Sequence, residues 1–333
     1  MKKNKNYFAG KTILITGATG SFGKAFLGHL LKNYSNIKKI IVFSRDELKQ
    51  FDLSLEYPER KYPNLRYFLG DVRDKDRLLS VTENVDYVVH AAAQKQVPAA
   101  EYNPFEAIKT NIMGAQNLIE ACIMQNVKKV IALSTDKAVA PQNLYGATKL
   151  CSDKLFISAN EIKGKKQIIF SIVRYGNVMG SRGSVIPVFL KQKKTGTLMI
   201  TDKNMTRFNV LMDKAIETVI WSLQNAKGGE VIIPKAPSYR IEDLAKAIAP
   251  KCKKKIIGIR PGEKLHEEMI NQNDAMYTYE LKDKYIISHK KNDYFNKPNI
   301  KKVEKNFSYN SKDNKYLTTN EIKKLVVKHF NLD

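Results

Sequence analysis

A pair of side chains near the middle of the sequence has the residue types and spacing needed for acid–base chemistry. Tyr145 and Lys149 form a Tyr-x-x-x-Lys pair, and side chains four residues apart share one face of a helix. An ammonium group beside a phenol stabilises the phenolate and lowers the phenol pKa, so we predict that Tyr145 exchanges a proton near neutral pH. Asp136 and Lys137 follow Thr135 at the end of an apolar run. Beside Tyr145 and Lys149 they are a second candidate pair for the same site, with an exposed ion pair as the alternative.

A glycine-rich turn at residues 16–23 predicts a dinucleotide site. Its glycines have the spacing G-x-x-G-x-x-G, directly after an apolar run and at the start of a helical pattern. Glycine permits the tight turn and the close approach of backbone to a pyrophosphate, and the helix N-terminus offers free N–H groups. A plain glycine-rich turn is the alternative, but it would not need both flanking elements. The residues that we assign to the dinucleotide here are Gly17, Thr19, Gly20, Ser21, Phe22 and Gly23.

The end of the next apolar run bears on the choice between NAD and NADP. An acidic residue at this position accepts the ribose 2′-OH of NAD, whereas an arginine accommodates the 2′-phosphate of NADP. The run ends in Ser44, Arg45 and Asp46, so we predict NADP and keep NAD as the less favoured cofactor. A solvated charge is the alternative role for Arg45. Asp71 and Val72 close the third run, where we expect them to meet the adenine.

Short apolar runs alternate with helical patterns through the first half of the chain. Such runs are typical of strands buried on both faces of a sheet, and their alternation with helices predicts a parallel α/β fold. We predict a Rossmann-type doubly wound parallel sheet within residues 1–176. Residues 177–333 are expected to form a smaller α/β substrate-binding domain with a C-terminal extension, and the chain is expected to cross between the two. The predicted strands are 12–16, 39–43, 66–69, 86–90, 129–133, 168–173, 230–234 and 255–259, and the predicted helices include 23–31, 111–124, 187–194, 212–223, 241–248 and 321–330.

The composition is that of an ordinary globular protein. The chain has 333 residues, 43% of them hydrophobic and 27% charged, which is enough to build a core without disulfides. No apolar run of 18 residues is present and no apolar segment lies near the N-terminus, so we predict neither a transmembrane helix nor a signal peptide. The three widely spaced cysteines favour the reducing cytoplasm. His90 and His266 lack partners at metal-ligand spacing, so we predict no metal.

The net charge is less ordinary. There are 57 Lys and Arg residues against 33 Asp and Glu residues, for a formal charge of +24. Nucleic-acid binding is one explanation of such a balance, and a lysine-rich solvated surface is the other. The basic residues are spread along the chain without a nucleic-acid-binding motif, so we predict no nucleic-acid partner. An anionic small substrate would benefit from the same field.

Together these motifs resemble the extended short-chain dehydrogenases/reductases, and within them the inverting UDP-N-acetylglucosamine 4,6-dehydratases of pseudaminic acid biosynthesis. The glycine turn, the Tyr-x-x-x-Lys pair and the strand order carry the broader resemblance. The closer resemblance covers roughly residues 8–270, and the rest of the chain matches loosely. The segments that carry it are 44–50, 70–74, 101–104, 133–138, 143–149, 174–178, 180–185, 205–208 and 257–267.

The resemblance implies conversion of UDP-GlcNAc to UDP-2-acetamido-2,6-dideoxy-β-L-arabino-hexos-4-ulose. NADP would take hydride from C4 while Tyr145 removes the hydroxyl proton. Lys137 would then remove the C5 proton, which requires a depressed pKa, and Asp136 would protonate the leaving C6 hydroxyl, which requires a raised one. Hydride would return to C6, and C5 would be reprotonated from the opposite face. The implied catalytic set is Thr135, Asp136, Lys137, Tyr145 and Lys149.

The resemblance also implies contacts to cofactor and nucleotide sugar. Guanidinium groups bind diphosphates in a bidentate way, Glu263 would accept a hydrogen bond from the uridine ribose, and Asn177 would hold sugar or phosphate. The further cofactor contacts implied are Ser44, Arg45, Asp46, Lys49, Asp71, Val72, Ala91, Ala93, Lys95, Tyr145, Lys149 and Val178. The substrate contacts implied are Lys95, Thr135, Asn177, Arg182, Arg207, Arg260 and Glu263, with Arg174 as a further diphosphate candidate.

Three alternatives stay open at this point. Retaining dehydratases of the dTDP-glucose type carry Glu where Lys137 stands, and a UDP-sugar 4-epimerase needs no Asp136–Lys137 pair. A nucleotide-binding or RNA-binding protein without catalysis would need no Tyr-x-x-x-Lys pair. Gln96 and Asn209 depart from the family pattern, so the fine sugar specificity is not defined. The resemblance also implies a homo-oligomer, with a hexamer as one form.

Overall fold

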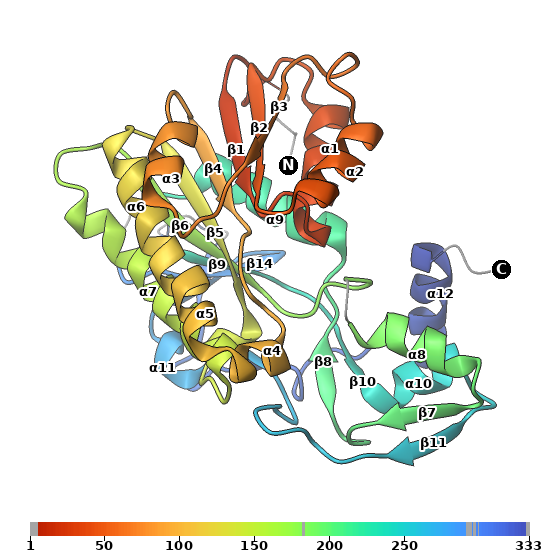
Figure 1. Cartoon of the computed structure of the whole chain (residues 1–333). Helices are drawn as coiled ribbons and strands as arrows, with labels where there is room; N and C mark the ends of the chain where they lie inside the picture. The colour runs from red at the N-terminus through yellow and green to blue at the C-terminus, as the bar shows by residue number, and fades with distance from the viewer. Residues whose placement is uncertain (1–5, 182–183, 291–294, 296–297, 299, 331–333) are drawn as a thin grey trace.

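One large sheet organises the chain. The computed structural model describes residues 6–181, 184–290, 295, 298 and 300–330, and in this part it contains a ten-stranded sheet of order β15-β13-β14-β9-β6-β5-β4-β1-β2-β3 (Figure 1). The strands from β3 to β9 in this order pair in parallel, and β14, β13 and β15 continue the sheet with antiparallel pairs. The order 3-2-1-4-5-6 is that of the doubly wound dinucleotide-binding folds, so the predicted fold class is confirmed.

The strands of this sheet are β1 (Thr12–Thr16), β2 (Lys39–Ser44), β3 (Leu65–Leu69), β4 (Tyr87–His90), β5 (Lys129–Thr135), β6 (Ile169–Tyr175), β9 (Val231–Pro234), β13 (Thr278–Glu280), β14 (Lys284–Ile287) and β15 (Lys301–Lys302). The smaller strands are β7 (Thr197–Ile200), β8 (Thr206–Phe208), β10 (Ser238–Arg240), β11 (Lys253–Ile256), β12 (Glu268–Ile270) and β16 (Tyr309–Asn310). The predicted strand at 255–259 therefore ends at residue 256.

The helices are α1 (Ser21–Asn33), α2 (Glu47–Glu56), α3 (Lys75–Val81), α4 (Val97–Tyr102), α5 (Pro104–Ile108), α6 (Gly114–Met124), α7 (Leu144–Ile162), α8 (Val185–Lys193), α9 (Met212–Asn225), α10 (Ile241–Ile248), α11 (Gln272–Ala275) and α12 (Thr319–Phe330). A π-helical turn, η1 (Lys109–Met113), joins α5 to α6, and a 3-10 turn, η2 (Asp136–Ala138), follows β5.

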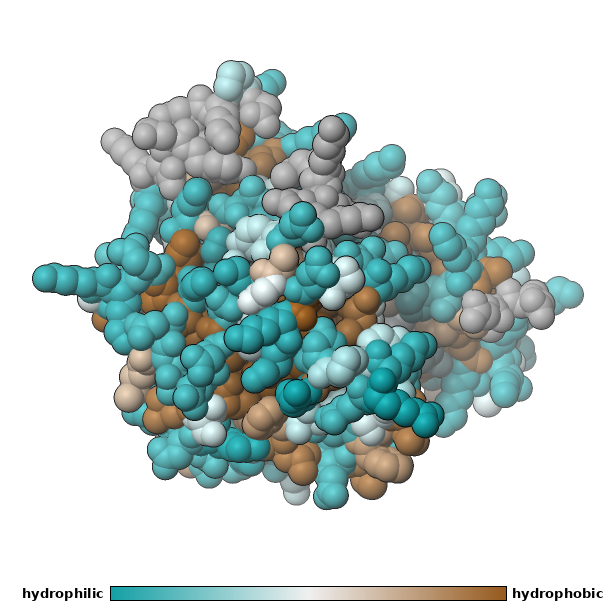
Figure 2. Space-filling model, turned by 90° about the horizontal axis from the view of Figure 1, so that it is seen from above, coloured by the Kyte–Doolittle hydropathy of each residue, from teal (hydrophilic) through white to brown (hydrophobic). Residues whose placement is uncertain are grey.

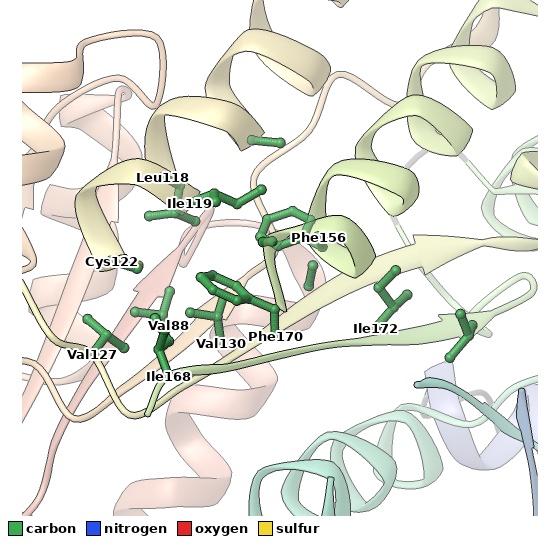
Figure 3. Packing of buried hydrophobic residues seen from close by; sticks show 14 of the residues in the cluster. Val88, Leu118, Ile119, Cys122, Val127, Val130, Phe156, Ile168, Phe170 and Ile172 are labelled. Atoms are coloured by element: carbon green, nitrogen blue, oxygen red, sulfur yellow. The ribbon is translucent and has the colours of Figure 1, made fainter. Parts of the chain in front are cut away.

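Two apolar layers cover the sheet because its central strands are buried on both faces. Helices α3, α6 and α7 pack on one face, and α1, α2 and α9 pack on the other (Figure 1). In the first layer Phe156 of α7 lies against Phe170 of β6, with a distance of 6.3 Å between ring centroids, and Leu118 and Ile119 of α6 lie beside them (Figure 3). This layer fixes the strand ends from which the candidate site is built.

The second half of the chain contributes to two separate cores. The large sheet includes strands β9, β13, β14 and β15, and helix α9 packs on it, although all of these elements follow residue 177. The parallel pair β7–β11 and helices α8, α10 and α12 enclose a smaller core of their own, which lies to one side of the sheet (Figure 1). The chain thus passes between the two parts more than once. The boundary at residue 176 stays a prediction.

The face of the molecule shown in Figure 2 is largely hydrophilic. Hydrophobic residues are scattered between the hydrophilic ones on this face. Among the described residues, the structure contains no helix that is both long and apolar enough to cross a bilayer.

The apolar layer under α7 generates a stability prediction. Phe170 is fully buried, so Phe170→Ala should lower the free energy of unfolding by about 3–5 kcal/mol, because it removes apolar contacts and leaves a cavity. Leu48→Ala is the control, since that side chain is 77% exposed and should change stability by no more than about 0.5 kcal/mol. Denaturant titration measures both. Equal unfolding midpoints for Phe170→Ala and the unchanged protein would contradict this packing.

Candidate functional site

Two adjoining cavities lie where the central parallel strands end. The first, of about 480 Å³, is lined by residues at or just beyond the carboxyl ends of β1, β2, β4, β5 and β6. The second, of about 310 Å³, extends from there toward α8, β7 and β8. In open α/β sheets this edge is where ligands bind. The two cavities share the residues Lys95, Gln96, Lys137, Asn177 and Ser184.

The glycine turn forms one wall of the first cavity. Gly17 has a φ of +68°, and a Cβ placed on it would lie 2.7 Å from the backbone nitrogen of Ala92. A Cβ on Gly23 would lie 2.5 Å from the Cα of Ala18, so this glycine permits the close packing of α1 on β1. Helix α1 begins directly after Gly20, and its first N–H groups have no partner within the helix. The turn therefore fits the pyrophosphate of a dinucleotide.

The end of β2 presents a cation to the same cavity. Asp46 caps α2 by accepting a hydrogen bond from the backbone nitrogen of Lys49 at 3.0 Å, and its carboxylate also pairs with the Lys49 ammonium. Arg45 is half-exposed, and its Nη1 lies 3.6 Å from Oδ2 of Asp71. Burial would raise the pKa of Asp71, but its bonds to Arg73 and the charge of Arg45 outweigh burial and lower it. The exposed part of the Arg45 guanidinium group suits a 2′-phosphate.

All the predicted cofactor residues line the first cavity except Asp71, which stands behind Arg45. The structure adds lining residues that sequence reasoning missed, among them Thr110 in the π-helical turn and Tyr175 at the end of β6. The hydroxyl oxygen of Thr110 is buried without a hydrogen-bond partner. Tyr175 could have been predicted, because it is the last residue of a parallel strand and ligands bind at that edge of the sheet. No local sequence pattern indicates that Thr110 lines the cavity.

Lys137 stands between two carboxylates at the junction of the two cavities. Strand β5 ends at Thr135, whose hydroxyl donates to Oδ1 of Asp136 at 2.9 Å. The Nζ atom of Lys137 lies 3.1 Å from Oδ1 of Asp136 and 3.1 Å from Oε1 of Glu267. The Nε atom of Arg207 lies 3.7 Å from the same oxygen of Glu267. Two carboxylates and two cations thus form one cluster.

Burial and the mutual charges of its members together set the protonation of this cluster. Asp136 is 0% exposed and Glu267 is 2% exposed. Burial raises the pKa of Asp136, against the charge of Lys137. Burial also opposes ionisation of Glu267 and Lys137, but at Glu267 the charges of Lys137 and Arg207 outweigh it and lower the pKa. At Lys137 the two carboxylates outweigh burial and raise the pKa. The raised pKa of the acid fits the expectation, whereas a depressed lysine pKa is wrong for this state because two anions flank the amine.

The tyrosine–lysine pair lies on the first turns of α7. The side chain of Asn143 caps this helix by accepting from the backbone nitrogen of Gly146 at 2.8 Å. Burial raises the pKa of Tyr145 to about 12, against the lowering effects of the Lys137 charge and of a hydrogen bond with Thr135. The expected lowering by Lys149 is therefore not seen. Burial lowers the pKa of Lys149 itself. Both side chains line the first cavity, Lys149 buried and Tyr145 partly exposed.

The second cavity gathers most of the predicted substrate residues. Lys95, Asn177, Arg207, Arg260 and Glu263 line it, whereas Thr135 lines the first cavity only. Arg207 is anchored by donating to the carbonyl oxygens of residues 206 and 265. Arg260 is largely exposed at the rim, with its Nη1 4.0 Å from Oε1 of Glu263. Arg182, the remaining predicted contact, lies outside the described residues.

Arg174 is not where its predicted role would place it, and three further residues had no predicted contact. Arg174 is buried away from both cavities and donates to the carbonyl oxygen of Met269 at 3.0 Å, so it connects elements of the fold. Asn209, one of the two departures from the family pattern, is buried and lines neither cavity, whereas Gln96 lines both. Glu267 is the last residue of the segment 257–267, which carries part of the family resemblance. Its contact with Lys137 could not be predicted, because the two residues are far apart in the sequence.

His90 is a buried, neutral histidine beside the first strand. Its Nδ1 lies 2.8 Å from the hydroxyl of Thr16. Burial, aided by the charge of Lys149, lowers the pKa of His90 to about 3, so the ring is neutral. Within the described part of the chain, no group of three or more His, Cys, Asp or Glu side chains is placed to hold a metal ion.

Similar solved structures support the fold. Pen from Bacillus thuringiensis is 40% identical, with a TM-score of 0.90, over 98% of this chain and 100% of that one. The UDP-glucuronic acid 4-epimerase from Bacillus cereus, solved with UDP-glucuronic acid and NAD, is 26% identical, with a TM-score of 0.67, over 76% of this chain and 88% of that one.

Sequence relatives place the chain more closely. An inverting UDP-N-acetylglucosamine 4,6-dehydratase from Campylobacter jejuni subsp. jejuni serotype O:2 is 54% identical over 308 residues, which cover 91% of this chain and 88% of the relative. A UDP-glucose 4-epimerase from Rickettsia akari is 41% identical over 332 residues, which cover 96% of each. These similarities confirm the resemblance drawn from the motifs. The polysaccharide biosynthesis protein family matches residues 13–289, and the chain belongs to this family.

Proposed function

We propose that the chain is a nucleotide-sugar 4,6-dehydratase that acts on UDP-GlcNAc and inverts C5. The observation that carries the proposal is the position of Lys137 at the junction of the two cavities, with Tyr145 lining the first cavity and the buried Asp136 3.1 Å from Nζ of Lys137. One acid–base residue serves C4, and an adjacent amine and carboxyl serve C5 and C6. A 4-epimerase needs the first function only.

The first cavity fits a nicotinamide dinucleotide, which when bound would accept hydride from C4 and return it to C6. The fit rests on the glycine turn, where a Cβ at Gly17 would meet backbone at 2.7 Å. We further propose NADP as the cofactor, because Arg45 lines the cavity while Asp46 is engaged with Lys49 and the start of α2. The chemistry at C4 then needs a proton acceptor, and Tyr145 supplies it.

Lys137 and Asp136 exchange one proton between them before the elimination. The amine is charged at rest, so it cannot remove the C5 proton. Its Nζ lies 3.1 Å from Oδ1 of Asp136, close enough for its proton to pass to the carboxylate. This transfer leaves a neutral amine and a protonated carboxyl. The amine then takes the C5 proton, the carboxyl gives its proton to the C6 hydroxyl, and water leaves as the C5–C6 double bond forms. The pair is again an ammonium and a carboxylate.

Further parts of the proposal rest on resemblance. We propose that the product enters pseudaminic acid synthesis, that the enzyme works in the cytoplasm and that it forms a homo-oligomer. The second candidate function is a UDP-sugar 4-epimerase, which the similarity to the Rickettsia akari relative favours. The Asp136–Lys137 pair argues against it.

Proton NMR of the purified protein with UDP-GlcNAc in D2O tests the proposed function. A new C6 methyl signal from a 4-keto sugar of L-arabino configuration, with deuterium at C5, is the expected result. The galacto epimer without a methyl signal would show that the second candidate is right. No conversion, even with NADP or NAD added, would refute both.

Lys137→Ala should lower the rates of water release and of proton exchange at C5 by at least about 100-fold, because the base for C5 is removed. Cofactor binding should be retained. Lys154→Ala, which removes an exposed lysine of α7, is the control and should leave the rate unchanged. Loss of substrate C6–OH is followed by NMR. A near-unchanged rate in Lys137→Ala would place the base on another residue.

Arg45→Asp should weaken NADP binding and favour NAD, because the cation beside the predicted 2′-phosphate is replaced by a carboxylate. Calorimetric titration with each dinucleotide measures the ratio of the two dissociation constants. Arg60→Asp makes the same change in charge at an exposed position outside the cavity and should leave this ratio unchanged. If NADP affinity is the same in Arg45→Asp as in the unchanged protein, the assignment of Arg45 is wrong.

A further inference from the structure

Glu267 is a buried carboxylate in the site that the proposed mechanism does not use. It lines the second cavity, and its Oε1 lies 3.1 Å from Nζ of Lys137, the same distance as Oδ1 of Asp136. Its other oxygen, Oε2, is buried without a hydrogen-bond partner. We propose, building on the proposed dehydratase function, that Glu267 is a positioning residue that keeps the amine of Lys137 charged and directed at Asp136 until substrate is in place.

The position of Glu267 is built into the fold. Its backbone nitrogen donates to the hydroxyl of Ser311 at 2.9 Å, and its carbonyl accepts from the backbone nitrogen of Ser311 at 2.7 Å. Arg207 of β8 holds the same carboxylate oxygen that faces Lys137. Because both the backbone and the carboxylate are held, the Lys137 amine lies between fixed anions rather than beside a mobile one.

Five charged or titratable groups surround the Lys137–Glu267 contact: Asp136 of η2, Tyr145 of α7, Arg207 of β8, Tyr239 of β10 and Lys264 of the segment before β12. Arg207 and Lys264 are cations that favour the ionised form of Glu267. An ionised Glu267 in turn favours the ammonium form of Lys137.

This arrangement has a consequence for the reaction at high pH. The dehydration step needs one proton within the Asp136–Lys137 pair, which moves from Nζ to Oδ1 and is then consumed at C6. If that proton is lost to solvent, no acid remains for the C6 hydroxyl. The charge of Glu267 raises the pKa of Lys137, so it retains the proton and extends activity to higher pH.

The test is Glu267→Gln, which keeps the shape of the side chain and removes its charge. The basic limb of the kcat–pH profile should move to lower pH by about 1 unit or more, the range produced by removing an opposite charge at this distance. Glu267→Asp, which keeps the charge, should restore most of this shift. Glu268→Gln is the matched control, because Glu268 accepts from Ser308 at 2.9 Å and forms no ion pair with Lys137 among those described; its profile should match the unchanged protein.

A readout without turnover separates the two claims. Acetic anhydride labelling of Lys137 as a function of pH, followed by mass spectrometry and normalised to the exposed Lys154, reports the neutral amine directly. The midpoint should fall by about 1 unit or more in Glu267→Gln. The labelling midpoint could fall in Glu267→Gln while neither the unchanged protein nor the variants dehydrate UDP-GlcNAc. In that case the effect of Glu267 on Lys137 is supported and the proposed function is wrong.

The opposite result would overturn the role of Glu267. In that result the unchanged protein dehydrates UDP-GlcNAc, but Glu267→Gln changes neither the kcat–pH profile nor the labelling midpoint of Lys137. Should Glu267→Gln not fold, Glu267→Ala replaces it in both measurements. A Lys137 labelling midpoint below that of the unchanged protein supports the role of Glu267, and an unchanged midpoint contradicts it.

Discussion

The ammonium group of Lys137 between two buried carboxylates is the interaction on which the site depends. Removing one member of a buried ion cluster leaves an uncompensated charge, which is strongly unfavourable. Here the members come from separate elements: Asp136 and Lys137 follow β5, Arg207 belongs to β8 and Glu267 precedes β12. The cluster therefore connects elements that are far apart in the sequence, and Lys137 places it at the point where the two cavities meet.

The sheet determines where this cluster can form. Because β1, β2, β4, β5 and β6 run in parallel, their carboxyl ends share one edge. The glycine turn, Arg45 and the Thr135–Lys137 segment are all brought there by strands that are far apart in sequence. Helix α7 packs against the same sheet and carries Tyr145 into the cavity. Dinucleotide and sugar are thus expected side by side, with the acid–base groups between them.

Local patterns in the sequence were sufficient for the central strands, the glycine turn and the tyrosine–lysine pair, because each depends on neighbouring residues. The predicted first-half strands lie within one or two residues of those observed at each end. Long-range contacts were not accessible in this way. Nothing near Glu267 indicates that it faces Lys137, and nothing near Arg174 indicates that Asp153 and Met269 surround it. The pKa directions of Tyr145 and Lys137 depend on burial and on distant charges, so residue spacing alone could not give them.

In the proposed reaction, hydride removed at C4 returns at C6 within the same site. The direct test is a single turnover of UDP-GlcNAc that carries deuterium at C4, with the product analysed by NMR and mass spectrometry. We expect the deuterium to appear in the C6 methyl group of the product. Deuterium returned to C4 of an epimerised sugar, or an unaltered substrate, would contradict this expectation.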